Sequence, residues 1–230
     1  MMKRIFAIAF GACCACFVLA PVQSSAQKFH NSYYDCRRAA HDQEGIPAGS
    51  VVFIGDSITE QGWWDMLFKQ RNIVNRGIGG DNTFGILDRL PDILAARPTK
   101  IFLMAGINDL SGGQSVDTIV GNIGRMADMI HEAVPECRLY IQSVLPISTK
   151  RLAYDYIKGH NPKVAQINAR LAELCAEKAE GGGCTFVDVA SLLSDADGEL
   201  RTDLTKDGTH LHPAAYRIWA DHLKKLKYLK

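Results

Sequence analysis

The most constraining feature of this 230-residue chain is the alternation of short apolar runs with longer segments of helical periodicity. An apolar run of a few residues is typical of a strand that is buried on both faces. Five such runs occur, at Val51–Ile54, Ile73–Val74, Ile101–Met104, Leu139–Ile141 and Phe186–Val187. Helical patterns cover residues 63–70, 84–96, 116–133, 164–178 and 214–226. Pro91 predicts a kink or an offset in the second of these helices. Strands that alternate with helices form a parallel sheet with helices on both faces.

A single domain over residues 27–230 accommodates these elements. The length is sufficient for one ordinary hydrophobic core, and no internal repeat, low-complexity tract or linker divides the segment. We therefore predict a three-layer α/β/α sandwich with a mainly parallel five-stranded sheet. The 26 basic and 25 acidic residues leave a formal net charge of +1, which provides no basic surface of the kind that binds nucleic acid.

Residues 1–26 have the pattern of a secretory signal peptide. Lys3 and Arg4 precede the apolar stretch Ile5–Ala20, and small residues end the segment at Ala26. A basic head, an apolar middle and small residues before the cleavage site are typical of an export signal. We expect cleavage after Ala26 and a secreted or periplasmic protein without stable membrane insertion.

Two alternatives to a cleaved signal peptide are open. The apolar stretch would be an uncleaved anchor if it spanned a bilayer, although it is short for that purpose. A lipoprotein signal would place a lipid anchor on Cys13, because Phe10–Cys13 resembles a lipobox, in which Phe fits the first position poorly. Cleavage after Ala26 is the preferred interpretation.

Four cysteines follow the signal segment, namely Cys36, Cys137, Cys175 and Cys184. In an oxidising compartment four cysteines allow three pairings. Cys175 and Cys184 flank a turn that contains Gly181–Gly183, so a disulfide between them is one interpretation. Four buried thiols are the other interpretation. The chain has no CxxC motif, which argues against a zinc or redox site.

Polar clusters follow three of the predicted strands, and a fourth cluster precedes the last predicted helix. They are Gly55–Ser57, Asn75–Asp81, Gly106–Asp109 and Asp207–His210. In a parallel α/β sheet, ligands bind beyond the carboxyl ends of the strands. These clusters are therefore the first candidates for a functional site. Residues 147–162 lack clear periodicity and are a candidate surface loop over that site.

Ser57 has two interpretations. It directly follows a predicted strand, and Gly55 permits a tight turn, so its hydroxyl is placed like a nucleophile at a strand-to-helix corner. The helix that follows would direct its first amides toward an anion near Ser57. The alternative is a helix N-cap, because Ser and Asp are favoured capping residues. On this motif alone, capping is the more common outcome.

Asp207 and His210 provide the partners that a nucleophilic serine needs. A serine hydroxyl requires a base, usually His, and the imidazole requires a carboxylate that sets its tautomer. A spacing of three allows both side chains to lie on one face of a turn. His212 competes with His210 for the role of base. A metal site made of Asp207 and both histidines is an alternative, but it lacks the spacing of a known zinc motif.

Two further clusters contain groups that can stabilise an oxyanion. Backbone N–H groups and an Asn amide suit this task because they are neutral and preorganised. Asn108 follows the third predicted strand, and the glycines of Gly77–Asp81 allow a backbone N–H to approach closely. The spacing of these glycines does not match the dinucleotide-binding fingerprint, so cofactor binding is a poor alternative.

The four clusters together resemble the motif blocks of the SGNH/GDSL hydrolases, a family of serine esterases, and the similarity extends over nearly the whole mature chain. The blocks are Gly55–Ile58, Asn75–Asp81, Gly106–Asp109 and Asp207–His210. The second block is most similar to that of members resembling platelet-activating-factor acetylhydrolase catalytic subunits. Ile58 replaces the usual Leu of the first block, and Ile107 occupies a position where Thr is frequent. Neither position has a catalytic role.

This resemblance implies the flavodoxin-like SGNH hydrolase fold and a set of residue roles. Ser57 would be the nucleophile, His210 the base and Asp207 its orienting partner. The backbone N–H groups of Ser57 and Gly80 and the side chain of Asn108 would form the oxyanion hole. The reaction would proceed through an acyl-serine, with no metal and no organic cofactor.

The substrate is less constrained than the reaction. Trp63 and Trp64 follow the candidate nucleophile closely and are candidates for a platform on which a sugar ring stacks, although either side chain could equally belong to the core. No long segment rich in Leu and Phe indicates a deep acyl tunnel, which favours a short acyl group such as acetyl. We expect a small-molecule or carbohydrate ester as the substrate, with O-acetyl groups on carbohydrates preferred.

Two other functions compete with an acetyl esterase. Lysophospholipase or thioesterase activity occurs in the same family and is the first alternative. The second is a non-catalytic, glycan-binding envelope protein in which the serine cluster only caps a helix.

Overall fold

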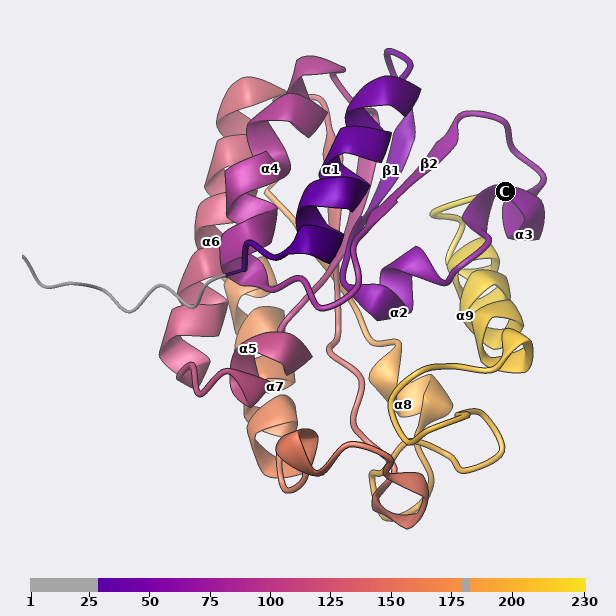
Figure 1. Ribbon diagram of the computed structural model, residues 1–230. Coiled ribbons are helices and arrows are strands. Elements are labelled where there is room, and N and C mark those ends of the chain that lie inside the picture. The colour runs from indigo at the N-terminus through magenta and orange to yellow at the C-terminus, as the bar shows by residue number, and fades with distance from the viewer. Residues whose placement is uncertain (1–28, 179–182) are drawn as a thin grey trace, which may run out of the picture.

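Five parallel strands form the centre of the computed structural model, which describes residues 29–178 and 183–230 (Figure 1). The strands are β1 (Val51–Gly55), β2 (Ile73–Gly77), β3 (Lys100–Met104), β4 (Arg138–Gln142) and β5 (Thr185–Val187). Their order in the sheet is β2-β1-β3-β4-β5, and every neighbouring pair is parallel. The five predicted strands and the α/β fold with a parallel sheet are confirmed. The predicted signal peptide, residues 1–26, lies outside the described residues.

Helices cover both faces of the sheet (Figure 1). One face carries α1 (Ser32–Glu44), α4 (Thr83–Ala95), α6 (Val116–Ala133) and α7 (Asn161–Lys178). The other face carries α3 (Trp64–Phe68), α8 (Ala190–Leu193) and α9 (Pro213–Lys225). Shorter elements lie in the connections, namely α2 (Ser57–Glu60), α5 (Ile107–Ser111) and the 3₁₀ turns η1 (Thr149–Arg151) and η2 (Asp155–Ile157).

The sheet separates two hydrophobic clusters. Val52 and Ile54 of β1 point toward α4, α6 and α7, whereas Val51 and Phe53 point toward α3 and α9. This division follows from the alternation of side chains along a strand. All five residues of β1 are buried, as expected for a central strand covered on both faces.

Strands β1, β2 and β3, which are neighbours in the sheet, end at the same level. Gly55, the last residue of β1, pairs with Gly77 of β2 and with Met104 of β3. The segments that follow these strands therefore leave the sheet side by side. This register brings together three polar clusters that are far apart in the sequence.

One helix was not expected from the sequence, and the predicted kink or offset at Pro91 concerns another. Helix α1 was not expected, because Ser32–Glu44 is mostly polar and has only two buried residues, Tyr34 and His41. Its start is defined by Asn31, whose side chain accepts hydrogen bonds from the N–H groups of Tyr33 and Tyr34. Pro91 lies inside α4, which continues beyond it to Ala95.

No helix within residues 29–178 and 183–230 combines the length and the apolar character that crossing a membrane requires.

The four cysteines that follow residue 26 occupy different environments. Cys137 and Cys175 are buried, Cys184 is partly exposed and Cys36 is exposed. The interpretation of four buried thiols is therefore wrong for Cys36. The sulfur atoms of Cys175, on α7, and Cys184, just before β5, lie 2.8 Å apart. Little movement would be needed to join this pair.

We expect oxidation to join Cys175 and Cys184 and to raise the free energy of unfolding. Closing a loop of about ten residues stabilises the folded state by about 2–3 kcal/mol. Urea unfolding of residues 27–230 with and without dithiothreitol measures the difference, and the variant Cys184→Ser should not respond to the reductant. Cys36→Ser is the matched control and should behave like the wild type. Four thiols reactive toward a thiol reagent in the oxidised, denatured protein would contradict the pairing.

Candidate active site

Ser57 lies directly beyond the end of β1 as the first residue of α2. The N-cap of this short helix is Asp56, whose carboxylate accepts a hydrogen bond of 2.9 Å from the N–H of Ile58. Capping is therefore performed by Asp56, and the Ser57 hydroxyl is left available for another partner. The interpretation of Ser57 as a helix cap is wrong.

A chain of hydrogen bonds connects Ser57 to two residues near the C-terminus. The Ser57 Oγ lies 2.9 Å from the Nε2 of His210, although 153 positions separate them in the sequence. On the other side of the ring, Nδ1 lies 2.7 Å from the Oδ2 of Asp207. With the ring proton on Nδ1, that N–H donates to Asp207 and Nε2 accepts the Ser57 hydroxyl. The imidazole is thus held between a hydroxyl and a carboxylate.

Asp207 also stabilises the turn that presents His210. Its Oδ1 accepts hydrogen bonds from the N–H of Thr209 at 3.0 Å and the N–H of His210 at 2.7 Å. Burial raises the pKa of Asp207, but the hydrogen bonds from His210 and Thr209 outweigh it, so the pKa lies below its ordinary value. The carboxylate is consequently ionised when it accepts from the imidazole. His212 does not take part in this chain of hydrogen bonds.

The turn between Asp207 and His210 is packed against residues 147–162. The N–H of Ser148 donates to the carbonyl of Gly208 at 2.8 Å, and the N–H of Ala153 donates to the carbonyl of Asp207 at 2.9 Å. Gly208 has a φ of +90°, and a Cβ there would lie 2.8 Å from the Cα of Leu152, so a side chain would clash. The ring of Tyr154 meets that of His210 edge-on, with centroids 6.1 Å apart. This segment, expected as a loop over the site, forms one wall of it.

Gly80 and Asn108, the remaining predicted site residues, follow β2 and β3 and so lie beside Ser57 at the same edge of the sheet. Gly80 has a φ of +77° and open space where a Cβ would stand. The amide of Asn108 donates a 2.8 Å hydrogen bond to the carbonyl of Asp81, which connects it to the Gly80 loop. Within the described part of the chain, the N–H groups of Ser57 and Gly80 donate to no other protein group. They are free to donate to a bound oxygen.

A buried ion pair supports the loop that carries Gly80. Arg89 of α4 is 2% exposed, and its Nε donates a 2.9 Å hydrogen bond to the Oδ2 of Asp81. Its two terminal nitrogens donate to the carbonyls of Arg76 at 2.6 Å and of Gly55 at 3.1 Å. One side chain therefore joins the ends of β1 and β2 to the loop beyond β2.

Three buried carboxyl groups lie in the same region as Arg89, namely those of Asp56, Asp81 and Asp109. Burial raises the pKa of Asp81, and the ion pair with Arg89 opposes that shift. Burial raises the pKa of Asp56 to about 7, and the charges of Asp81 and Asp109 add to the shift. Burial also raises the pKa of Asp109 to about 6, although hydrogen bonds from Thr83 oppose it. The region beneath Ser57 therefore disfavours additional negative charge.

Sequence reasoning missed several side chains that hold the site together. Asn75 donates from its amide to the carbonyls of Thr59, Glu60 and Gly62, and accepts from the N–H of Gly77 at 2.9 Å. Glu60 accepts a 2.9 Å hydrogen bond from the N–H of Gly79. The sequence analysis included Asn75 in the polar cluster Asn75–Asp81 but assigned this residue no role. The sequence around Glu60 and Arg89 does not indicate their roles, because a charged residue in a helical pattern is ordinarily exposed to solvent.

Only one of the two predicted tryptophans can contact a substrate. Trp64 is 1% exposed, stacks on Phe53 with ring centroids 4.2 Å apart and donates its indole N–H to the carbonyl of Thr59. The prediction of Trp64 as a substrate-binding residue is wrong, because α3 turns this side chain into the core. Trp63, the residue before it, is 66% exposed and lines a surface cleft.

The arrangement has the components of acyl transfer. A hydroxyl lies against an imidazole that a carboxylate orients, and free N–H groups stand at the neighbouring strand ends. Among residues 29–178 and 183–230, no group of three or more His, Cys, Asp or Glu side chains is placed to hold a metal ion.

Comparison with known proteins agrees with this architecture. The model of the GDSL-like lipase/acylhydrolase family matches residues 53–218. Platelet-activating factor acetylhydrolase IB subunit alpha1 of Homo sapiens is 31% identical over 174 residues, which cover 72% of this chain and 70% of the human protein.

Two further similarities concern bacterial proteins. N-acylneuraminate cytidylyltransferase of Streptococcus agalactiae serotype III is 27% identical over 186 residues, or 77% of this chain; the chain matches only 40% of that enzyme's length. The crystal structure of a candidate acylhydrolase from Bacteroides fragilis superimposes with a TM-score of 0.73 at 25% identity, covering 87% of this chain and 100% of the other.

The raised pKa of Asp56 predicts a pH-dependent effect of Asp56→Asn on stability. Between about pH 4 and pH 7 the folded protein binds more protons at this site than the unfolded chain, so ionisation of Asp56 lowers the free energy of unfolding as pH rises. Asn does not titrate and can keep the cap. As pH rises through this range, the free energy of unfolding of the variant should therefore increase relative to that of the wild type. A shift of three pKa units sets an upper limit of about 4 kcal/mol on this gain.

Urea unfolding at pH 4.5, 6 and 7.5 would measure this gain, as about 1–3 kcal/mol between the extremes. Asp42→Asn removes a carboxylate at an exposed position of α1 and is the matched control. A stability difference for Asp56→Asn that does not change with pH would contradict the assignment.

Proposed function

Because the chain belongs to the GDSL-like lipase/acylhydrolase family, we propose that it is a serine esterase that removes short acyl groups, chiefly acetyl, from carbohydrate alcohols. Family membership supports the general activity of an ester hydrolase. The residues that perform the reaction, the acyl group and the alcohol are the proposed part.

One observation carries the proposal, namely the hydrogen-bond chain from Ser57 through His210 to Asp207, with distances of 2.9 Å and 2.7 Å. A nucleophilic serine needs a base within about 2.6–3.2 Å and a third group that orients the base. The three side chains satisfy both requirements and are only partly exposed. We assign Ser57 as the nucleophile, His210 as the base and Asp207 as the residue that orients it.

In the first half-reaction, Ser57 Oγ attacks the ester carbonyl carbon while Nε2 of His210 accepts the hydroxyl proton. The carbonyl oxygen becomes an oxyanion, which the N–H groups of Ser57 and Gly80 and the amide of Asn108 stabilise. The bond between the carbonyl carbon and the alcohol oxygen then breaks. His210 returns the proton to that oxygen, so the alcohol leaves neutral and an acyl-serine remains.

In the second half-reaction, His210 removes a proton from water, which attacks the acyl-serine. The same donors hold the second oxyanion. On its collapse the bond between the carbonyl carbon and Ser57 Oγ breaks, His210 returns its proton to Oγ, and the carboxylic acid leaves. Asp207 remains ionised throughout, because its hydrogen bonds hold its pKa below the ordinary value. The positive charge that forms on His210 is thereby stabilised at each step.

Similarity to named relatives supports the acyl group and the alcohol. The human relative is named as an acetylhydrolase, which supports acetyl as the acyl group. The Streptococcus agalactiae relative is named for N-acylneuraminate, a sugar, which supports a carbohydrate alcohol. The exposed indole of Trp63 provides a surface on which the apolar face of a sugar ring can pack. The proposed location is outside the cytoplasm, on the basis of the signal pattern of residues 1–26.

We expect Ser57→Ala and His210→Ala each to lower kcat/KM for p-nitrophenyl acetate by about 10³–10⁵-fold, because each removes a group that the chemical step requires. Hydrolysis is measured by release of p-nitrophenol, and circular dichroism checks that the variants are folded. Ser191→Ala and His131→Ala alter exposed residues of the same types and should retain wild-type activity. Equal rates for the wild type and folded Ser57→Ala would overturn the assignment.

A series of p-nitrophenyl esters tests the acyl group. We expect kcat/KM to fall at least about tenfold from acetyl to octanoyl, because the chain has no long segment rich in Leu and Phe to line an acyl tunnel. Rising values toward dodecanoyl would instead favour a lysophospholipase or thioesterase.

A further inference from the structure

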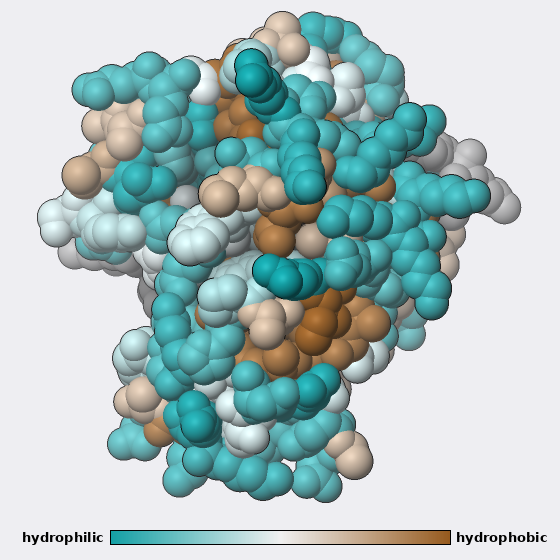
Figure 2. Space-filling model, turned by 90° about the vertical axis from the view of Figure 1, so that its right-hand side faces the viewer, coloured by the Kyte–Doolittle hydropathy of each residue, from teal (hydrophilic) through white to brown (hydrophobic). Residues whose placement is uncertain are grey.

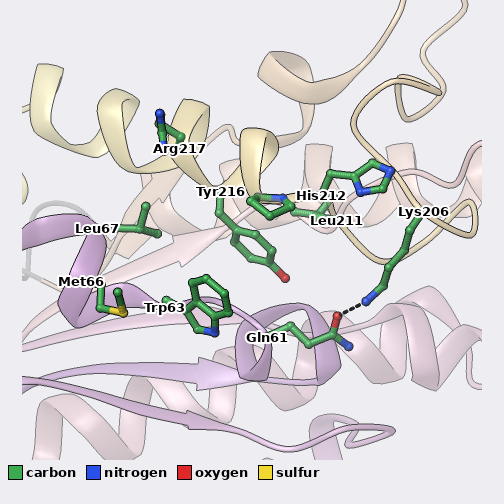
Figure 3. Close-up of a pocket in the computed structure, with 10 residues that line it drawn as sticks. Gln61, Trp63, Met66, Leu67, Lys206, Leu211, His212, Tyr216 and Arg217 are labelled. Carbon is green, nitrogen blue, oxygen red and sulfur yellow. Dashed lines mark hydrogen bonds between the residues drawn. The ribbon is translucent and has the colours of Figure 1, made fainter.

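A surface cleft of about 620 Å³ opens beside the catalytic residues, between the segment after α2 and the start of α9 (Figure 3). Trp63, Met66 and Leu67 form one wall, and Leu211 and Tyr216 face them from the other. Apolar groups make up most of its lining. The only hydroxyl among these side chains, that of Tyr216, is already used, since it donates to the carbonyl of Ile58 at 2.7 Å.

The cleft begins where the catalytic residues end. The N–H of Gln61 donates to the carbonyl of Ser57, and the N–H of Lys206 donates to the carbonyl of His210, each at 3.0 Å. The side chains of Gln61 and Lys206 then meet across this end of the cleft, with the Lys206 Nζ donating to Gln61 Oε1 at 2.7 Å (Figure 3). Ser57 and His210 do not themselves line the cleft, so an alcohol bound at Ser57 would reach it past the side chains of Gln61 and Lys206.

The walls of the cleft expose apolar surface that a folded protein ordinarily buries. Trp63 is 66% exposed and Met66 is 67% exposed, whereas Trp64 between them is fully buried. Figure 2, which looks at the side of the molecule that carries α3 and α9, shows apolar residues gathered between hydrophilic ones. Large exposed apolar side chains around a concavity indicate a binding site.

The charges at the cleft have one sign. Lys206 lies at the catalytic end and Arg217 lies on α9 at the other, and none of the described residues that line the cleft carries a carboxylate. Neither cation forms an ion pair with a residue of the described chain. An apolar cleft with two unpaired cations suits a molecule that combines an apolar surface with a negative charge.

The position of the cleft shows which half of an ester would occupy it. In acyl transfer the imidazole returns its proton to the leaving oxygen, so the alcohol lies on the histidine side of the scissile bond. The cleft is lined by Lys206, Leu211 and His212, which flank His210. Its lining includes no residue of the loops that carry Gly80 and Asn108. It thus lies on the side of His210, where the alcohol leaves, and away from the loops of Gly80 and Asn108.

We propose that this cleft is the binding site for the alcohol half of the substrate, and that it selects an alcohol with an apolar surface and an anionic group. The inference rests on the proposed esterase function and specifies its substrate. Two kinds of molecule share this chemistry, namely an acidic sugar and an amphiphilic alkyl alcohol. The experiment below includes one pair of esters for each kind.

The test varies the alcohol while the acyl group stays acetyl. One pair is hexyl acetate and acetoxyhexanoate; the other is monoacetylated methyl glucoside and monoacetylated methyl glucuronoside. All four give the same acetyl-enzyme, so differences in kcat/KM report the acylation step alone. We expect the anionic member to exceed its neutral partner by about tenfold in at least one pair. The pair with the larger effect identifies the kind of alcohol.

Three variants connect that preference to the cleft. Arg217→Gln and Lys206→Gln should each reduce the ratio between the anionic and the neutral ester, because each removes one cation. Trp63→Ala should lower kcat/KM for hexyl acetate more than for ethyl acetate, since the larger alcohol loses more contact. Lys225→Gln and Leu226→Ala are the controls, because both residues are exposed near the end of α9 and neither lines the cleft. They should match the wild type.

Direct binding provides a second readout that needs no turnover. Calorimetry with Ser57→Ala should detect hydroxyhexanoate or methyl glucuronoside, the free alcohol of the preferred pair, and adding Trp63→Ala should weaken its binding about tenfold.

The inference is overturned if neither pair shows an anion preference, or if Trp63→Ala changes the ratio between ethyl acetate and ethyl hexanoate instead of the alcohol preference. In both of these results the wild type still hydrolyses esters. Failure of the proposed function has a different signature, because the wild type would then be no faster than Ser57→Ala on any ester.

Discussion

The arrangement of the candidate active site depends on one buried arginine, Arg89. Arg89 donates to the last residue of β1, to the main chain of β2 and to the carboxylate of Asp81, so it connects two strand ends with the loop that presents Gly80. Removing one partner from a buried ion pair leaves an uncompensated charge and costs several kcal/mol. The parallel register also constrains the position of the loops. Strands β1, β2 and β3 end at the paired residues Gly55, Gly77 and Met104, so the loops that follow them lie at one edge of the sheet. The positions of the candidate oxyanion donors are therefore fixed by the hydrogen bonds of Arg89 beneath them, rather than by the loops themselves.

The same edge of the sheet separates two kinds of environment. Beneath Ser57, the buried Asp56 and Asp109 have raised pKa values, because burial penalises their charged forms. At the surface, Asp207 has a lowered pKa, because three hydrogen bonds stabilise its charge. The ionised carboxylate of Asp207 is thus placed where it can stabilise a protonated imidazole. The contact between Lys206 and Gln61 lies between this polar centre and the apolar cleft that we propose for the alcohol.

Sequence patterns predicted the sheet well and the individual side chains less well. All five strands and the five long helical patterns correspond to structure, because apolar periodicity reports directly on burial. Helix α1 escaped notice because it buries only two residues, and its capping by Asn31 is a weaker signal than an apolar face. For the candidate site, Ser57, His210 and Asp207 were recognised from their motif blocks, and the structure places them in hydrogen-bond contact. The supporting residues Glu60 and Arg89 were not recognised, because their partners lie in other elements.

The sequence by itself determined the layer order of the fold and the chemical types available at each strand end. These properties are local, since they follow from apolar runs and from polar residues directly after them. Only the tertiary structure decided that Asp56 rather than Ser57 caps α2, that Trp64 is buried while Trp63 faces solvent, and that Lys206 meets Gln61. The sequence does not distinguish the adjacent residues Trp63 and Trp64. Which of them is exposed depends on how the five-residue helix α3 packs on the sheet. Contacts between residues 57 and 210 likewise depend on strand order and loop packing, which no local pattern contains.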